Sequence, residues 1–214
     1  MKLQLCLPFQ LFQVTIRFVR IILNSRIRYL DLSKLPRALR VELCIGISKL
    51  TGLETLNFGM GAPIPSASHI NSPSDMGTLS YREYVGIGGK FHKLWMAMRC
   101  LSKLKSLTLN NDCRNETLTV LGQNCPDLAY LDISGSHSVT DIGASWMLHC
   151  RKLEQANLYQ TSIGVEGYAQ LLLALPNLFS IGRCDKFGQI LEYIARGQNP
   201  NISLTNSMSK VNQL

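Results

Sequence analysis

Histidine, cysteine and acidic side chains are the groups with which this chain could hold a metal ion or activate a nucleophile. Such chemistry needs a base held against a nucleophile, or several ligands gathered at motif spacing. His149 lies beside Cys150, and we interpret that pair as structural. The four histidines are scattered, with no cysteine or carboxylate at ligand or triad spacing: His69, His92, His137 and His149. The sequence therefore predicts no catalytic residues, no metal site and no enzyme activity.

A glycine-rich stretch at residues 86–90 is the part of the chain that comes nearest to a phosphate-binding loop. Its sequence, G-I-G-G-K, lacks the spacing of the P-loop motif, and Phe91 stands where the hydroxyl group should be. We predict a turn before a helix around Trp95 and expect no cofactor.

The seven cysteines are odd in number and include no C-x-x-C pair, which argues against a disulfide framework and a zinc site. Cys100, Cys125 and Cys150 recur at a constant interval, as a small buried apolar side chain does in a repeat. We expect reduced core thiols in a cytoplasmic protein, with the nucleus as an alternative. Secretion is less favoured, because glutamines and arginines interrupt the apolar N-terminus.

A repeated apolar core of the form L-x-x-L-x-L organises the chain. Its copies start at Ile27, Leu53, Leu104, Leu128, Leu153 and Leu178, the last copy ending in Arg183 instead of an apolar residue. The starts are almost evenly spaced except between Leu53 and Leu104, where the interval is twice as long, and we interpret that long interval as two repeats. Residues 59–78, rich in proline and serine, predict a loop insertion that leads into a poor strand at residues 79–84. The alternative is an insertion without a strand, since Arg82 occupies an apolar position of that copy.

Each copy predicts a strand followed by a helix. The L-x-L segments alternate apolar and polar residues, and the stretches after them have apolar residues three and four apart. Thr140 and Asp141 offer capping oxygens to one helix, while Pro126 and Pro176 follow helix ends. Because one unit cannot bury its apolar side alone, we expect the units to stack. The predicted fold class is α/β, a leucine-rich-repeat solenoid with a curved parallel sheet inside, helices outside and about six to seven repeats.

The composition, 46% hydrophobic and 17% charged, allows a buried core, and the chain divides into three parts. We predict an N-terminal helical cap or remnant over residues 1–26 and the solenoid over residues 27–197, with its loop insertion near 59–78. Residues 198–214 are predicted to be a flexible tail. The apolar stretches are far shorter than the roughly 20 residues that span a bilayer, so no membrane association is expected.

The repeats carry a family resemblance. The sequence C-P-D-L-A-Y-L-D-I-S-G at residues 125–135, followed by V-T-D-I-G, resembles the cysteine-containing leucine-rich repeat of ribonuclease-inhibitor-like proteins and F-box receptors. The resemblance is good over residues 100–184 and fair over 27–60. It departs at Ser136, where the family often has a second cysteine, and at Ala156, which weakens one strand. The regular repeats and the absence of a catalytic constellation favour a non-catalytic protein-interaction scaffold. The resemblance implies, as the alternative, a substrate-recognition subunit of a cullin-type ubiquitin ligase that lacks or has lost its F-box, with the cullin-ligase adaptor as a partner.

The residues that flank the buried L-x-L side chains form the candidate binding site, because side chains alternate across a strand. Tyrosine beside amide groups is enriched in protein interfaces. We predict that Tyr130 lies beside Gln155 and Asp132 beside Asn157 on adjacent strands. The alternative is that these are merely solvated strand positions. The predicted partner-binding residues are Thr108, Asn110, Tyr130, Asp132, Gln155, Asn157 and Tyr159.

The net charge of +8 lies mainly in residues 1–50, which alone carry +7. A basic segment has two interpretations, a patch for nucleic acid or an acidic partner and a solvated face, and we favour the second. Few aromatic residues lie among these arginines, so a stacking platform for single strands is not indicated. We expect a monomer whose partner is another protein rather than nucleic acid.

Overall fold

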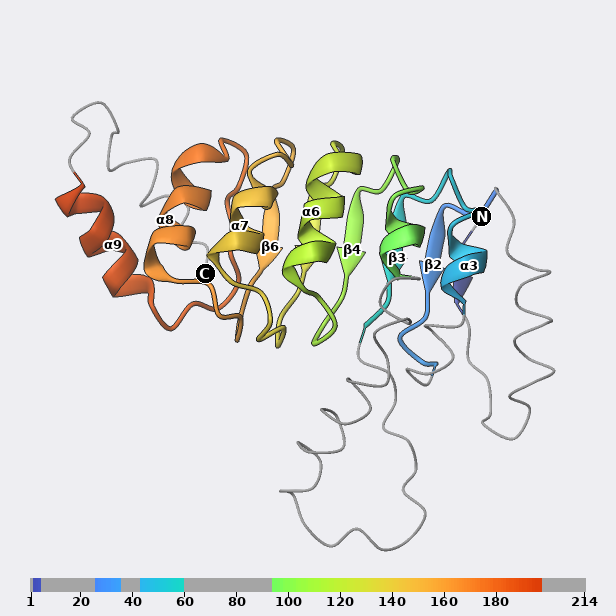
Figure 1. Ribbon diagram of the computed structural model, residues 1–214, viewed down its shortest axis with the longest axis horizontal. Helices are drawn as coiled ribbons and strands as arrows, with labels where there is room; N and C mark the ends of the chain where they lie inside the picture. Colours follow the sequence, from blue (N-terminus) through green and yellow to red (C-terminus); the bar gives the residue numbers. More distant parts are fainter. Residues whose placement is uncertain (1, 5–25, 36–42, 60–93, 198–214) are drawn as a thin grey trace, which may run out of the picture.

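A parallel sheet runs along the molecule. The computed structural model describes residues 2–4, 26–35, 43–59 and 94–197. Within these residues six strands are hydrogen-bonded in chain order, each parallel to the next (Figure 1). They are β1 (Lys2–Gln4), β2 (Tyr29–Asp31), β3 (Thr55–Asn57), β4 (Ser106–Thr108), β5 (Tyr130–Asp132) and β6 (Gln155–Asn157). Ser180 extends the sheet with a parallel bridge to Gln155.

Helices follow the strands along the same row. They are α3 (Cys44–Ile47), a short helical segment at residues 94–98, α6 (Asn115–Asn124), α7 (Asp141–Met147), α8 (Val165–Ala174) and α9 (Phe187–Arg196). Helix α6 packs on α7, α7 on α8, and α8 on α9. The sequence prediction of an α/β protein with a parallel sheet is confirmed.

The apolar positions of the repeat build one continuous core. The central residues of β2–β6 are fully or almost fully buried, and they are Leu30, Leu56, Leu107, Leu131 and Ala156. Ile181, after β6, is also buried. Neighbouring central residues are register partners, so each leucine packs beside the leucine of the next repeat. Burial of one leucine side chain stabilises a fold by roughly 1.5–3 kcal/mol. The stacked leucines therefore fix the register of the sheet.

The long interval between Leu53 and Leu104 is a single step in the sheet. Strand β3 pairs directly with β4, Thr55 opposite Ser106 and Leu56 opposite Leu107. The prediction of two repeats with a strand at residues 79–84 between them is wrong, although those residues themselves lie outside the described part. A strand there would direct Arg82 into the core, and burial of an unpaired guanidinium is costly. Direct packing of Leu56 on Leu107 avoids that cost.

The N-terminal segment contains a strand that the sequence analysis did not predict. This strand, β1, lies within residues 1–26 and pairs with β2. Residues 5–25 and 198–214 lie outside the described residues, so the helical cap and the flexible tail remain predictions. The insertion predicted near 59–78 also lies outside them, apart from Gly59.

The predicted capping oxygens bind the neighbouring repeat. Thr140 is the N-cap residue of α7, yet its side chain makes no capping hydrogen bond within that helix. Instead Asn115 Nδ2 donates to Thr140 Oγ1 at 2.9 Å, and the Thr140 backbone N donates to Asn115 Oδ1 at 3.0 Å. Asp141 Oδ1 accepts a hydrogen bond from the Gly164 backbone N at 2.7 Å. These groups connect the repeat to its neighbours, so the prediction of capping within the helix was wrong.

Candidate functional site

The residues on either side of each buried central residue form one polar face of the sheet, which we call the open face. Its members in β2–β6 are Tyr29, Asp31, Thr55, Asn57, Ser106, Thr108, Tyr130, Asp132, Gln155 and Asn157. In β3, β4, β5 and β6 both flanking side chains keep part of their surface exposed to solvent. The register places Tyr130 beside Gln155, and Asp132 between Thr108 and Asn157. The predicted adjacency of these residues is confirmed.

Asp132 and Asn110 form hydrogen bonds within the chain, close to the ends of β4 and β5. Asn110 Nδ2 donates to Asp132 Oδ1 at 2.9 Å and lies 2.7 Å from Ser134 Oγ. The Ser134 backbone N also donates to Asp132 Oδ1, at 3.0 Å. A carboxylate that accepts two hydrogen bonds from its own chain has fewer acceptor sites for a partner. Asp132 and Asn110 thus mainly fix the conformation of the chain around the site.

The same turn recurs in other repeats. Asp31 Oδ1 accepts from the Ser33 backbone N at 2.9 Å, and Asn157 Oδ1 accepts from the Tyr159 backbone N at 3.3 Å. An Asp or Asn side chain that bonds the backbone two residues on fixes a turn. We infer that the predicted binding residue Asn157, like Asp132, positions the loop after its strand.

Tyr130, Gln155 and Thr108 are the predicted residues whose polar groups remain available. Within the described residues, no intramolecular hydrogen bond forms to the Tyr130 hydroxyl, the Gln155 amide or the Thr108 hydroxyl. Partial burial raises the pKa of Tyr130, and the nearby Asp132 carboxylate raises it further. The hydroxyl group is therefore neutral at physiological pH and can both donate and accept a hydrogen bond.

Tyr159 contacts Arg183, the residue that replaces an apolar residue at the end of the last repeat. The Arg183 guanidinium carbon lies 5.0 Å from the centre of the Tyr159 ring, within the range of a cation–π interaction. Gly182 precedes Arg183 with φ +69, a conformation that glycine adopts without strain, and Arg183 is exposed. At the other end of the sheet, Lys2 Nζ lies 4.6 Å from the ring centre of Tyr29.

The cysteines follow the register of the strands rather than a constant interval. Cys125 and Cys150 are buried as predicted, but Cys100 is exposed and that prediction was wrong. Counted back from the following strand, the residue equivalent to Cys125 is Leu101, because this step is shorter by one residue than the next. Leu101 is fully buried, and Cys125 Sγ lies 3.4 Å from its carbonyl oxygen.

Alkylation should distinguish these thiols within one molecule. Burial raises the pKa of Cys125 to about 12 and that of Cys150 to about 11. The thiolate is the reactive form, so at pH 8 we expect iodoacetamide to label Cys100 readily and the two buried thiols only after denaturation. Peptide mass spectrometry of native and denatured samples measures this, with Cys100 as the internal control. Rapid native labelling of Cys125 and Cys150 would contradict the burial described here.

The described histidines are not brought together. His137 and His149 are exposed, and the His149 ring stacks on Trp146 at 5.3 Å while Cys150 is buried. Among the residues that the structure describes, no group of three or more histidine, cysteine or acidic side chains could hold a metal ion. In that same part of the chain no helix has the length and apolar character needed to cross a membrane.

Comparison with known proteins adds little to this geometry. No protein-family model matches the chain, and no curated protein matches it. Among solved structures the chain is similar to an internalin from Listeria monocytogenes, at 13% sequence identity and a TM-score of 0.22. The alignment covers 76% of this chain and 63% of the internalin chain, less than two thirds of that protein. A likeness this weak carries no argument about the fold or function of the chain.

Proposed function

We propose that the chain is a leucine-rich-repeat solenoid of the ribonuclease-inhibitor-like class and serves as a non-catalytic scaffold that binds another protein. Repeats that each supply one strand and one helix, with the strands paired in chain order, support this class. Helices are wider than strands, so stacking curves the sheet and makes the open face concave. The described cysteines form no disulfide, which favours the cytoplasm.

One observation carries the proposal: the open face presents available polar groups on a rigid frame. Tyr130, Gln155 and Thr108 project from paired strands, and the turns after β5 and β6 are fixed by Asp132 and Asn157. A preorganised surface loses less conformational entropy on binding, which favours affinity. Tyrosine is also among the residues that most often dominate interface energies.

A charge placed on the open face should block binding. Gln155 is exposed, so Gln155→Arg should leave the fold intact but place a long cation between Tyr130 and the partner. We expect the parent chain, used as bait in a cell extract, to retain specific proteins that Gln155→Arg retains at least about tenfold less well. Quantitative mass spectrometry measures the difference.

Gln123→Arg is the matched control, because Gln123 is exposed on α6 and lies outside the open face. Equal retention of every protein by the parent, Gln155→Arg and the control would show that the open face is not the binding site. Recovery of a cullin together with its adaptor would instead favour the ubiquitin-ligase alternative.

A further inference from the structure

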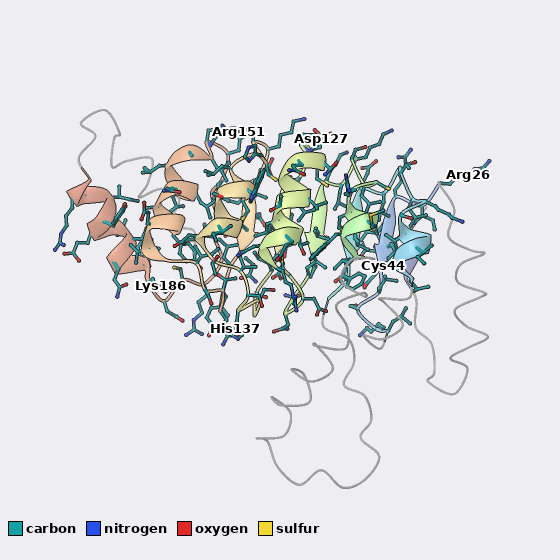
Figure 2. All side chains as sticks on the ribbon, viewed as in Figure 1. Arg26, Cys44, Asp127, His137, Arg151 and Lys186 are labelled. Carbon is teal, nitrogen blue, oxygen red and sulfur yellow. The ribbon has the colours of Figure 1, made fainter. Side chains whose placement is uncertain are left out.

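One long edge of the molecule collects the segments that join each helix to the next strand, and we call it the helix-to-strand edge. Because the strands are parallel and in register, these segments come together where the strands begin. Figure 2 shows Arg26, Asp127 and Arg151 along this edge and His137 and Lys186 along the opposite one. The segments are residues 48–54, 99–105, 125–129, 148–154 and 175–179, and residues 26–28, which precede β2, lie at the same edge.

The helix-to-strand edge has an excess of positive charge. Its described basic residues are Arg26, Arg28, Lys49, Arg99, Lys103, Lys105, Arg151 and Lys152. Its described acidic residues are Glu54, Asp127 and Glu154, which leaves a net charge of +5. The described residues of the opposite edge, with the first turns of the helices, have a net charge of −1: Lys34, Arg114, Arg183, Lys186, Asp112, Glu116, Asp141, Glu166 and Asp185.

Two of the three acidic residues are already paired with cations of the same edge. Glu54 lies 3.0 Å from Lys105 Nζ and 3.9 Å from Arg28, and Asp127 lies 2.6 Å from Lys152 Nζ. The hydrogen bond and charge of Lys105 lower the pKa of Glu54, and those of Lys152 lower the pKa of Asp127. Both carboxylates are therefore ionised and neutralised, and the excess cations remain.

Helix dipoles account for only part of this excess. The helices α3, α6, α7 and α8 and the helical segment 94–98 all end at this edge. Each C-terminus carries at most about half a negative charge, so five supply roughly −2.5. Arg151 illustrates this effect, because its guanidinium donates to the carbonyl oxygen of Ala174 at the end of α8. About half of the net positive charge of the helix-to-strand edge is therefore not offset by the helix dipoles.

The unused charge is concentrated beside β3 and β4. Lys49, Arg99 and Lys103 are exposed on two neighbouring segments, and none of them has an ion-pair partner among the described residues. The described segments of this edge contain a single Phe, Tyr or Trp residue, Phe179, so bases of a nucleic acid would find little to stack on. We propose that the helix-to-strand edge binds an acidic segment of a protein partner, centred on Lys49, Arg99 and Lys103.

Charge reversal tests this proposal separately from the open face. The probe is a fluorescent 20-residue peptide of alternating glutamate and glycine, with binding followed by anisotropy in about 50 mM NaCl, where screening is weak. We expect Arg99→Glu with Lys103→Glu to weaken binding at least tenfold. Lys34→Glu with Arg196→Glu, two exposed cations elsewhere, changes the net charge equally and should weaken it less than twofold.

Circular dichroism establishes that both double variants are folded. Equal weakening by the two variants would overturn the proposal, because net charge alone would then explain binding. Tighter binding of a 20-nucleotide oligothymidylate than of the peptide, lost in the Arg99 and Lys103 variant, would overturn it in favour of a nucleic-acid site. Gln155→Arg, on the open face, should leave peptide binding within twofold. This outcome would show that the helix-to-strand edge binds the peptide independently of the open face.

Discussion

Leu131→Ala should lower the free energy of unfolding by about 4 kcal/mol, toward the upper part of the range of roughly 2–5 kcal/mol for such truncations. Leu131 is fully buried at the centre of β5, with Leu107 and Ala156 as its register partners. The variant would place two alanines side by side in the core. A cavity bordered by another small residue is hard to fill by relaxation, so the loss should be large. Urea denaturation followed by circular dichroism measures it.

Two controls separate cavity formation from general sensitivity. Ile142→Ala removes a similar apolar side chain from α7, but Ile142 is 68% exposed, so we expect a change within about 0.5 kcal/mol. Leu131→Met conserves the volume of the core and should cost less than about 1.5 kcal/mol. If Leu131→Ala costs no more than Ile142→Ala, the assignment of Leu131 to the stacked core is wrong.

Strands β2–β6 were predictable because a single physical requirement fixes them, whereas β1 was not predicted. Each L-x-L segment must bury its apolar residues beside those of the next repeat, and the register partners Leu30, Leu56, Leu107 and Leu131 follow that rule. A one-residue shift would reverse the two faces of a strand. The adjacency of Tyr130 and Gln155 follows from the same rule.

Other features depend on contacts that sequence spacing does not specify. The long interval between Leu53 and Leu104 fits either two repeats or one repeat with an insertion, and only the pairing of β3 with β4 distinguishes them. The roles of Asp132 and Asn110 depend on side-chain hydrogen bonds, one between neighbouring repeats and one to the backbone two residues on, which the spacing of apolar residues does not specify. Arg183 stands at an apolar position of its repeat and yet is exposed, and the spacing does not reveal the positive φ of the preceding Gly182.

Replacement of Tyr130, on the open face, and Tyr159, two residues after β6, should weaken partner binding at least tenfold while the fold remains stable. A buried interface tyrosine typically contributes about 2 kcal/mol or more, and a tenfold change in Kd corresponds to about 1.4 kcal/mol. Both rings lie outside the leucine core, so Tyr130→Ala with Tyr159→Ala removes only partial burial and the contact of Tyr159 with Arg183. That contact contributes about 0.5–1 kcal/mol at an exposed site, so thermal stability should change little.

Isothermal titration calorimetry with a partner recovered by the parent chain measures the effect, and thermal unfolding measures the stability. Tyr193→Ala is the matched control, because Tyr193 is 45% exposed on α9 and does not belong to the open face. The control removes one tyrosine ring from α9, so a loss restricted to the double variant locates the binding energy at Tyr130 and Tyr159. Unchanged affinity of the double variant for every identified partner would exclude the open face, and the exposed surfaces of α6–α9 would then be the surfaces to examine.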